Sequence, residues 1–337
     1  LPQLYNFRYC LAAQMGEAKT ALSILAEAVF DRGFWYRPEV FDDPDLTSLR
    51  EHADFRRCRE SSLEMYERER RAARTLCSWS EKRGERIALA LHGNQQDGER
   101  ASEDWRAMNS LGYQLESLQS RELDSYGSFR WEDDGDGAEQ LAEACGRIRW
   151  NEYRSRCLCG FSAGCNVILK ALAHGGVRCE TVVLQSPWIP MLEGQDADGL
   201  FRHLVEGEVR LLVICGTEDR DCFGPAQGLV DKAREEGVVC QDIWIQGMGH
   251  RFPGDLGELL SRRLAGPLPS LDRKKEKMVR RFLRPSLHLR FRTTLRTRFT
   301  SGDRLLESEL ATFPVSRMSF LNRVTAMNMT SRAMAEE

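Results

Sequence analysis

The residue types that together perform nucleophilic catalysis occur in this chain in the order serine, aspartate, histidine. Ser162 is the centre of a Gly-Phe-Ser-Ala-Gly pentapeptide, Asp219 lies three residues after Gly216, and His250 follows Gly249. A serine hydroxyl becomes a nucleophile when an imidazole accepts its proton and a carboxylate fixes the tautomer of that imidazole. The three residues therefore predict attack on a carbonyl group by Ser162, with His250 as the base and Asp219 as the orienting acid.

The pentapeptide lies between a predicted strand and a predicted helix. Residues 157–159 end an apolar run, and residues 163–173 have helical periodicity that is closed by two glycines. A chain that turns from strand to helix over one residue strains the backbone there, and glycines two positions before and after relieve the crowding. This context favours a nucleophilic role for Ser162. The alternative is an ordinary turn in which Ser162 only caps the helix.

Two other carboxylates, Glu218 and Asp221, compete with Asp219 on the same loop. We prefer Asp219 because its distance from Gly216 suits the usual reach of such a loop. Of the six histidines, only His250 has the required order and position. His92 follows the apolar run 87–91, and we interpret it as a structural residue at a strand end.

Acyl transfer also needs hydrogen-bond donors for the oxyanion that forms during attack. The backbone amide of Ala163, at the start of the predicted helix, is one candidate donor. A second donor is expected from the loop after residues 87–91, and we assign it to the Asn94 amide.

Strand-like and helix-like segments alternate from residue 87 onward. The expected strands cover residues 87–91, 114–118, 157–159, 181–184, 209–215 and 238–245, and the expected helices cover 102–108, 137–149, 163–173, 226–236 and 256–264. This alternation predicts an α/β fold, with a parallel sheet and helices on both of its faces. In such sheets the functional loops gather at the carboxyl ends of the strands, where the motifs above all lie.

The residues before this sheet are predicted to be helical. Residues 5–33 form two expected helices whose apolar residues have the spacings of a tetratricopeptide (TPR) repeat, with a plain helical hairpin as the alternative. One repeat cannot bury its own apolar face. Because the connector that starts at Phe34 carries three adjacent aromatic residues, we expect residues 5–60 to dock on the α/β domain and to offer their free face to a protein partner.

These patterns divide the chain into four parts. We predict a TPR-like segment over residues 1–60, a charged linker helix over 61–84, an α/β catalytic domain over 85–266 and a basic, disordered tail over 267–337. Within the tail, residues 271–304 have a net charge of +9, whereas the whole chain has a net charge of −3. The body is therefore acidic, which gives no support to a nucleic-acid partner.

Composition excludes several other classes. No apolar run is long enough to span a bilayer, and no signal-peptide pattern is present, so we expect a cytoplasmic protein. The eleven cysteines contain no Cys-x-x-Cys pair, and several lie in strand-like runs. They are therefore expected to be buried thiols and not a disulfide or zinc framework. We expect neither a metal nor an organic cofactor.

Residues 85–265 resemble a minimal α/β-hydrolase of the phospholipase/carboxylesterase type. The resemblance rests on an ordered set of motifs: the loop from His92 to Asn94, the pair Gln119-Ser120, the segment Phe129 to Asp133, the pentapeptide from Gly160 to Gly164, the loop from Gly216 to Asp219, and Gly249-His250 followed by Phe252-Pro253. It implies hydrolysis of a carboxylic ester through an acyl-enzyme. Three residues are possible substrate contacts, namely Gln119, Trp131 and Trp188, although core packing is an equal alternative for each tryptophan.

The sequence thus predicts a serine hydrolase that acts on a small-molecule ester. A thioesterase or a peptidase could use the same residues. A different alternative is an interaction protein, in which helical repeats recruit a partner and the hydrolase domain has little or no activity.

Overall fold

A computed structural model describes residues 1–78, 84–132, 135–194 and 197–264 of this chain. The predicted tail over residues 267–337 lies outside these ranges. The helical elements are α1 (Pro2–Gln14), α2 (Ala18–Ala26), η1 (Glu27–Asp31), α3 (Pro38–Phe41), η2 (Pro44–Leu49), α4 (Ala53–Ala72), α5 (Gly98–Asp104), α6 (Ala107–Ser110), α7 (Gly137–Arg147), η3 (Trp150–Glu152), α8 (Ala163–Ala173), η4 (Pro190–Glu193), α9 (Ala197–Glu206), α10 (Phe223–Glu235) and α11 (Leu256–Leu264). The strands are β1 (Leu76–Cys77), β2 (Arg86–Leu91), β3 (Gln114–Gln119), β4 (Glu122–Ser125), β5 (Ser128–Arg130), β6 (Ser155–Phe161), β7 (Thr181–Gln185), β8 (Arg210–Gly216) and β9 (Val239–Ile245).

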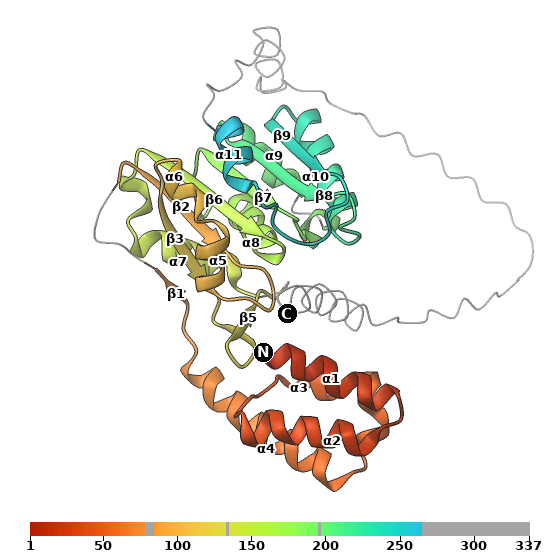
Figure 1. The fold of residues 1–337 in the computed structure, drawn as a ribbon. Coiled ribbons are helices and arrows are strands. Elements are labelled where there is room, and N and C mark those ends of the chain that lie inside the picture. The colour runs from red at the N-terminus through yellow and green to blue at the C-terminus, as the bar shows by residue number, and fades with distance from the viewer. Residues whose placement is uncertain (79–83, 133–134, 195–196, 265–337) are drawn as a thin grey trace, which may run out of the picture.

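Seven of these strands form the central sheet, in the order β1-β3-β2-β6-β7-β8-β9 (Figure 1). All neighbouring strands are parallel except β1, which pairs antiparallel with β3. Strand β6 runs through the middle of the sheet and is buried from Cys157 onward, because helices cover both of its sides. The carboxyl end of β6 therefore lies between the ends of β2 and β7.

Two apolar clusters cover the two faces of the sheet. On one face, residues of α7, α8, α9 and α10 pack on alternate residues of the strands, such as Leu89, Leu158 and Val213. On the other face, α5, α6 and α11 pack on the intervening residues, such as Ala90 and Cys159. The prediction of an α/β fold with helices on both faces of a mostly parallel sheet is confirmed.

Several elements differ from the sequence-based expectation. The predicted linker helix over residues 61–84 is wrong in its bounds, because α4 runs without interruption from Ala53 to Ala72 and the boundary at residue 60 falls inside it. Leu76, which was expected on that helix, belongs to β1. The antiparallel hairpin of β4 and β5 and the helix α9 were not expected at all.

The N-terminal helices have a core of their own. Tyr5, Ala21 and Leu25 of the first two helices pack against aromatic and aliphatic residues from the segment 34–58. The turn between α1 and α2 contains Gly16, whose positive φ of 77° is a conformation that glycine adopts without strain. The apolar face of the helical hairpin is thus buried mainly by the chain that follows it.

This helical unit docks on the β4–β5 hairpin (Figure 1). The connector runs antiparallel to β4, since the Arg37 amide donates to Asp124 O and the Tyr126 amide donates to Trp35 O. Phe34 and Trp35 are buried, and both contact the ring of Tyr126. The structure therefore agrees with the expectation that the aromatic connector joins the helices to the α/β domain.

Two further sequence expectations concern the membrane and the cysteines. Within the described ranges, no helix combines the length and the apolar character that a membrane span requires. All eleven cysteines lie within the described ranges and none forms a disulfide bond, and all except Cys77 and Cys240 are buried.

Candidate functional site

Ser162 occupies a strained turn at the carboxyl end of β6. Its backbone has a φ of 51° and a ψ of −120°, and it immediately precedes α8. Serine rarely adopts a positive φ, so the surrounding structure must impose this conformation. The Ser162 side chain makes no capping hydrogen bond to the helix. The alternative in which Ser162 only caps α8 is therefore wrong.

The two glycines of the pentapeptide are required by close packing. A Cβ atom at Gly164 would lie 2.6 Å from His92 O and 2.9 Å from Leu91 O, which are backbone atoms at the end of β2 and just after it. A Cβ atom at Gly160 would lie 2.9 Å from the Cys165 amide nitrogen. The turn can therefore approach both the neighbouring strand and its own helix only because these side chains are absent.

Asp219 and His250 are joined by a hydrogen bond, with 2.9 Å between His250 Nδ1 and Asp219 Oδ2. Asp219 follows β8 and is 3% exposed, whereas His250 follows β9 and is partly exposed. The competing carboxylates Glu218 and Asp221 are both exposed. The structure thus brings His250 together with Asp219, the carboxylate that the sequence analysis preferred.

The charge state of Asp219 depends on opposing effects. Burial disfavours the carboxylate, whereas the hydrogen bond and the charge of His250 favour it, and the pKa of Asp219 lies below its ordinary value as a result. The Cys215 thiol donates to Asp219 Oδ2 at 3.8 Å, and the nearby Ser186 and Cys222 side chains lower the pKa of Asp219 further. Asp219 is therefore ionised at neutral pH and can hold the Nδ1 proton of His250.

Phe161 and Gln185 connect Ser162 to the His250 loop. The ring of Phe161 lies against the His250 imidazole, with 4.9 Å between the two ring centroids. The Ser162 amide donates to Gln185 O, and the Gln185 side-chain amide donates to Arg251 O at 2.9 Å. Among the described residues, no hydrogen bond joins the Ser162 hydroxyl to His250 directly. Ser162 and His250 lie at the same edge of the sheet. The absence of a direct hydrogen bond does not exclude catalysis, because the distance between a nucleophile and its base is often long when no substrate is bound.

The loop after β2 lies against Ser162. A Cβ atom at Gly93 would be 3.0 Å from Ser162 Cβ, so this loop approaches the turn closely. The amide of Gly93 donates to Gln96 Oε1, and the amide of Gln95 donates to Phe129 O. In the described part of the chain, the Asn94 amide between them has no acceptor. The backbone amide of Asn94, which is the predicted second oxyanion donor, is therefore available for a new hydrogen bond close to Ser162.

His92 has the structural role that the sequence suggested. It is fully buried, its Nδ1 lies 2.7 Å from Gly93 O, and its Nε2 accepts a hydrogen bond from the Ser120 amide at 3.1 Å. Burial lowers the pKa of His92 to about 4. Because both ring nitrogens are engaged and the ring stays neutral, His92 is not available as a second base.

The three predicted substrate contacts have different surroundings. Trp131 is 2% exposed, stacks on His92 and donates from Nε1 to His92 O at 2.8 Å. Its backbone amide donates to Asn94 Oδ1. Trp131 therefore packs beneath the loop from His92 to Asn94 and does not line an open pocket. Of the two interpretations of Trp131, core packing holds and substrate contact does not. The side chain of Gln119 accepts a hydrogen bond from the Gly98 amide, so it holds the start of α5.

Trp188 remains close to the nucleophile. Its amide donates to Ser162 O at 3.2 Å, and its side chain is partly exposed. Sequence reasoning missed the supporting residues Phe161, Gln185, Ser186 and Cys222. The only feature of the sequence that could have indicated these four residues is that each lies in, or within three residues of, a motif at the end of a strand.

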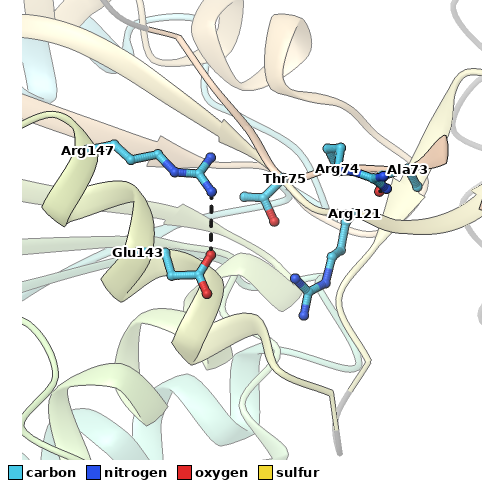
Figure 2. A pocket seen from close by; sticks show the side chains of 6 residues that line it. All are labelled: Ala73, Arg74, Thr75, Arg121, Glu143 and Arg147. Carbon is cyan, nitrogen blue, oxygen red and sulfur yellow. Dashed lines mark hydrogen bonds and ion pairs between the residues drawn. The ribbon is translucent and has the colours of Figure 1, made fainter. Parts of the chain in front are cut away.

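A separate hollow of about 460 Å³ lies at the junction between the helical unit and α7 (Figure 2). Its lining contains none of the predicted site residues: Ala73, Arg74, Thr75, Arg121, Glu143 and Arg147. The side chains of Arg147 and Glu143 form an ion pair at 3.6 Å, and Arg121 is paired with Asp136. The lining offers neither a serine nor a histidine, so this hollow is not the candidate active site.

Comparisons with known proteins agree with this fold. The family model described as "A/B hydrolase-like, N-terminal domain" matches residues 1–73, which end one residue after α4. No curated protein matches the chain. A solved structure of an uncharacterized protein from Bacillus cereus ATCC 10987 is 26% identical to this chain, with a TM-score of 0.51 over 78% of this chain and 86% of that one.

Two carboxylesterase structures are more distant. The enzyme from Mesorhizobium loti is 18% identical, with a TM-score of 0.42 over 55% of this chain and 91% of its own. The Bacillus cereus carboxylesterase is 16% identical, with a TM-score of 0.45 over 60% of this chain and 97% of its own. The arrangement of the sheet and the family model of residues 1–73 together give this chain an α/β-hydrolase-type fold preceded by a helical segment. The TPR-like character of that segment is not confirmed, and the comparisons give no support for a protein partner.

Proposed function

We propose that this chain is a serine hydrolase that cleaves a small carboxylic ester through an acyl-enzyme. One observation carries the proposal: a strained Ser162 shares an edge of the sheet with an imidazole that is hydrogen-bonded through Nδ1 to the buried Asp219. A hydrogen bond at Nδ1 leaves the Nε2 lone pair of His250 free to accept a proton. The family description of residues 1–73 supports a hydrolase in general terms.

The proposed reaction has two halves. In the first, Ser162 Oγ attacks the ester carbonyl while His250 Nε2 takes the hydroxyl proton, and His250 then passes that proton to the departing alkoxide. In the second, a water molecule attacks the acyl-serine, His250 takes its proton, and the carboxylic acid leaves as Ser162 recovers the proton. Asp219 remains ionised in both halves and stabilises the imidazolium.

The amides of Ala163 and Asn94 would stabilise the oxyanion in both halves. The first amides of a helix lack partners within the helix, so the Ala163 amide is available at the start of α8. Removal of a single oxyanion donor costs about 3–4 kcal/mol of transition-state stabilisation in a serine hydrolase. Trp188, beside Ser162, is the aromatic residue that we assign to the substrate pocket.

A fluorophosphonate probe tests the proposal because it labels only an activated serine. We expect the wild-type chain to be labelled, and Ser162→Ala to lose labelling and ester turnover while its melting temperature changes little. Ser110→Ala, at an exposed position of α6, is the matched control and should be labelled normally. A folded wild-type chain that resists labelling would overturn the proposal and favour the inactive hydrolase domain with an N-terminal interaction module.

The substrate class requires a second measurement. Esters, thioesters and amides with the same acyl group should be compared by kcat/KM. We expect the ester to be preferred. A preference for the thioester or the amide would keep the triad and change the assigned substrate.

A further inference from the structure

A third metal-ligating side chain accompanies Asp219 and His250, although the proposed hydrolysis does not use it. The sulfur of Cys222 lies 3.6 Å from His250 Nδ1, and the ligand atoms of all three residues lie within 4.8 Å of one another. Cys222 is 1% exposed and Asp219 is 3% exposed. A thiol, an imidazole and a carboxylate are the three donor types that zinc binds in proteins.

The local fold fixes these donors. Asp219 and Cys222 are three residues apart in one turn, in which the amides of Cys222 and Phe223 both donate to Asp219 O. Cys222 directly precedes α10, and His250 comes from the separate loop after β9. Two ligands from one tight turn and another from a distant loop are a common arrangement in zinc sites.

We propose that Asp219, Cys222 and His250 bind a Zn²⁺ ion reversibly and that the bound ion inhibits the enzyme. A tetrahedral ion about 2.3 Å from sulfur and about 2.0 Å from nitrogen holds these two atoms about 3.5 Å apart. The distance between Cys222 Sγ and His250 Nδ1 is 3.6 Å, so this pair already has the required spacing. Asp219 Oδ2 lies 2.9 Å from the same nitrogen and needs to move by only a few tenths of an ångström.

The inhibition follows from the tautomer of His250, and this step rests on the proposed function. Zn²⁺ binds the lone pair of Nδ1, so the neutral ring must then carry its proton on Nε2. A protonated Nε2 cannot accept the proton of the Ser162 hydroxyl. The ion also replaces the hydrogen bond between His250 and Asp219. Binding therefore removes the base and leaves Ser162 a weak nucleophile.

The environment explains why such binding would be reversible. A thiol binds a metal ion as its thiolate, so the ion must displace the proton of Cys222 before sulfur can coordinate it. The His250 side chain is 25% exposed, which gives an ion a path from solvent to the three donors. Water is expected to complete the four ligands.

The full-length chain, freed of metal with a chelator, tests this proposal in two ways. Co²⁺ is the spectroscopic probe, because sulfur coordination gives a thiolate-to-cobalt charge-transfer band. Zn²⁺ affinity is measured by competition with a chromophoric chelator. In parallel, ester turnover is titrated with Zn²⁺, and each variant is normalised to its own activity in chelator.

We expect Cys222→Ala and Cys222→Ser to lose the charge-transfer band. Their Zn²⁺ dissociation and inhibition constants should rise at least about 100-fold, since even an indirect partner of a metal ligand contributes about 10–100-fold to affinity. Cys77→Ala and Cys240→Ala remove the two partly exposed thiols and are the matched controls. These controls should keep both the band and the inhibition.

Two results would overturn the proposal. A charge-transfer band that survives the Cys222 substitutions would place the metal elsewhere, and undiminished Zn²⁺ inhibition in those variants would show that inhibition does not pass through this site. If the chain hydrolyses no ester, the inhibition fails together with the proposed function. The cobalt spectra still decide whether the metal site exists.

Discussion

The ion pair between Arg37 and Asp124 offers a test of whether the N-terminal helices stabilise the proposed active site. Arg37 belongs to the connector after the first helices, and Asp124 belongs to β4 of the hairpin. Arg37 Nε lies 3.1 Å from Asp124 Oδ1, and each side chain is only 10% exposed. Arg37→Met removes the guanidinium group and retains a long apolar side chain.

The expected loss of stability is about 3–5 kcal/mol, which is typical when one partner of a buried ion pair is removed. The remaining carboxylate modifies this figure. Burial raises the pKa of Asp124 and the charge of Arg37 offsets part of that rise, so without Arg37 the pKa should rise further. A folded-state pKa above the unfolded value means that stability is lost as pH rises through the folded-state pKa. Arg37→Met should therefore be most destabilising on the alkaline side of that pKa.

Arg37→Met should also alter the position of the loop that contains Asn94, the proposed oxyanion donor. Phe129 of β5 exchanges two backbone hydrogen bonds with Gln95 and Gln96, each of 2.8 Å, and these residues directly follow Asn94. The hairpin thus lies between the helical unit and the loop. Loss of one oxyanion donor reduces kcat by about 10²–10³-fold, and a displaced donor should cost less, so we expect a reduction in kcat of about tenfold. KM should change little, since the donor acts mainly in the transition state.

Urea denaturation gives the stability change, and steady-state kinetics below the unfolding transition give kcat and KM. Arg70→Met is the matched control, because Arg70 and Glu67 form an exposed pair on α4 that should contribute less than about 1 kcal/mol. The double variant of Arg37→Met with Asp124→Asn should be less destabilised than the sum of the single variants. A loss below about 1 kcal/mol for Arg37→Met would refute the energetic argument. A full loss of stability with unchanged kcat would show that the hairpin does not position the loop.

Three further predictions concern the site itself. Asp219→Asn should lower kcat by about 10⁴-fold through loss of the correct imidazole tautomer. Asp221→Asn, at an exposed position, should change kcat little. If steady-state assays gave the reverse ranking, Asp221 would be the residue that orients His250. His92 has a folded-state pKa of about 4 against an ordinary value of 6.5, so only the unfolded state gains this proton as pH falls through that window. As pH falls from about 6.5 to about 4, the unfolding free energy should therefore drop by about 3 kcal/mol more in the wild type than in His92→Gln. If urea titrations gave the same pH dependence for both proteins, this prediction would be wrong. Gly164→Ala places a methyl group 2.6 Å from His92 O. It should lower the unfolding free energy by about 1–3 kcal/mol, measured by thermal unfolding, and should reduce activity. Unchanged stability and activity would mean that the turn can adapt to the methyl group.

The sequence predicted the six parallel strands of the central sheet because most of them are short apolar runs with their own signal, whereas β1, which has only two residues, was missed. The helix after the nucleophile has the predicted bounds of residues 163–173, and the last described helix has the predicted bounds of 256–264. In both, apolar periodicity begins and ends sharply within the segment. These elements are specified by neighbouring residues, so a single sequence is enough to place them.

The hairpin of β4 and β5 could not be predicted in this way. Its strands have four and three residues, and they are stabilised on one side by the connector at Trp35 and on the other by Gln96. Neither partner is near the hairpin in sequence. The error at the linker has a related cause, since the charged helix α4 is continuous with the more apolar segment from Ala53. Its buried residues Phe55, Cys58 and Ser62 face a core that only the folded unit creates.

The order of the site residues was predictable because the topology constrains it. Parallel strands that share a sheet present their carboxyl ends at one edge, so residues just after β6, β8 and β9 must approach one another. Which carboxylate faces the imidazole is a finer question that depends on burial, and here Asp219 is buried whereas Glu218 and Asp221 are exposed.

The side chains that support the site follow a different rule. Cys222 was one buried thiol among many in the sequence, and only the turn at the start of α10 places its sulfur 3.6 Å from His250 Nδ1. Phe161 was an unconstrained position within the pentapeptide, yet its ring contacts the imidazole. Such contacts join residues from 28 to 89 positions apart, and they depend on side-chain packing that no local pattern encodes. The sequence can therefore identify candidate catalytic groups, whereas the side chains packed around them become visible only in the folded chain.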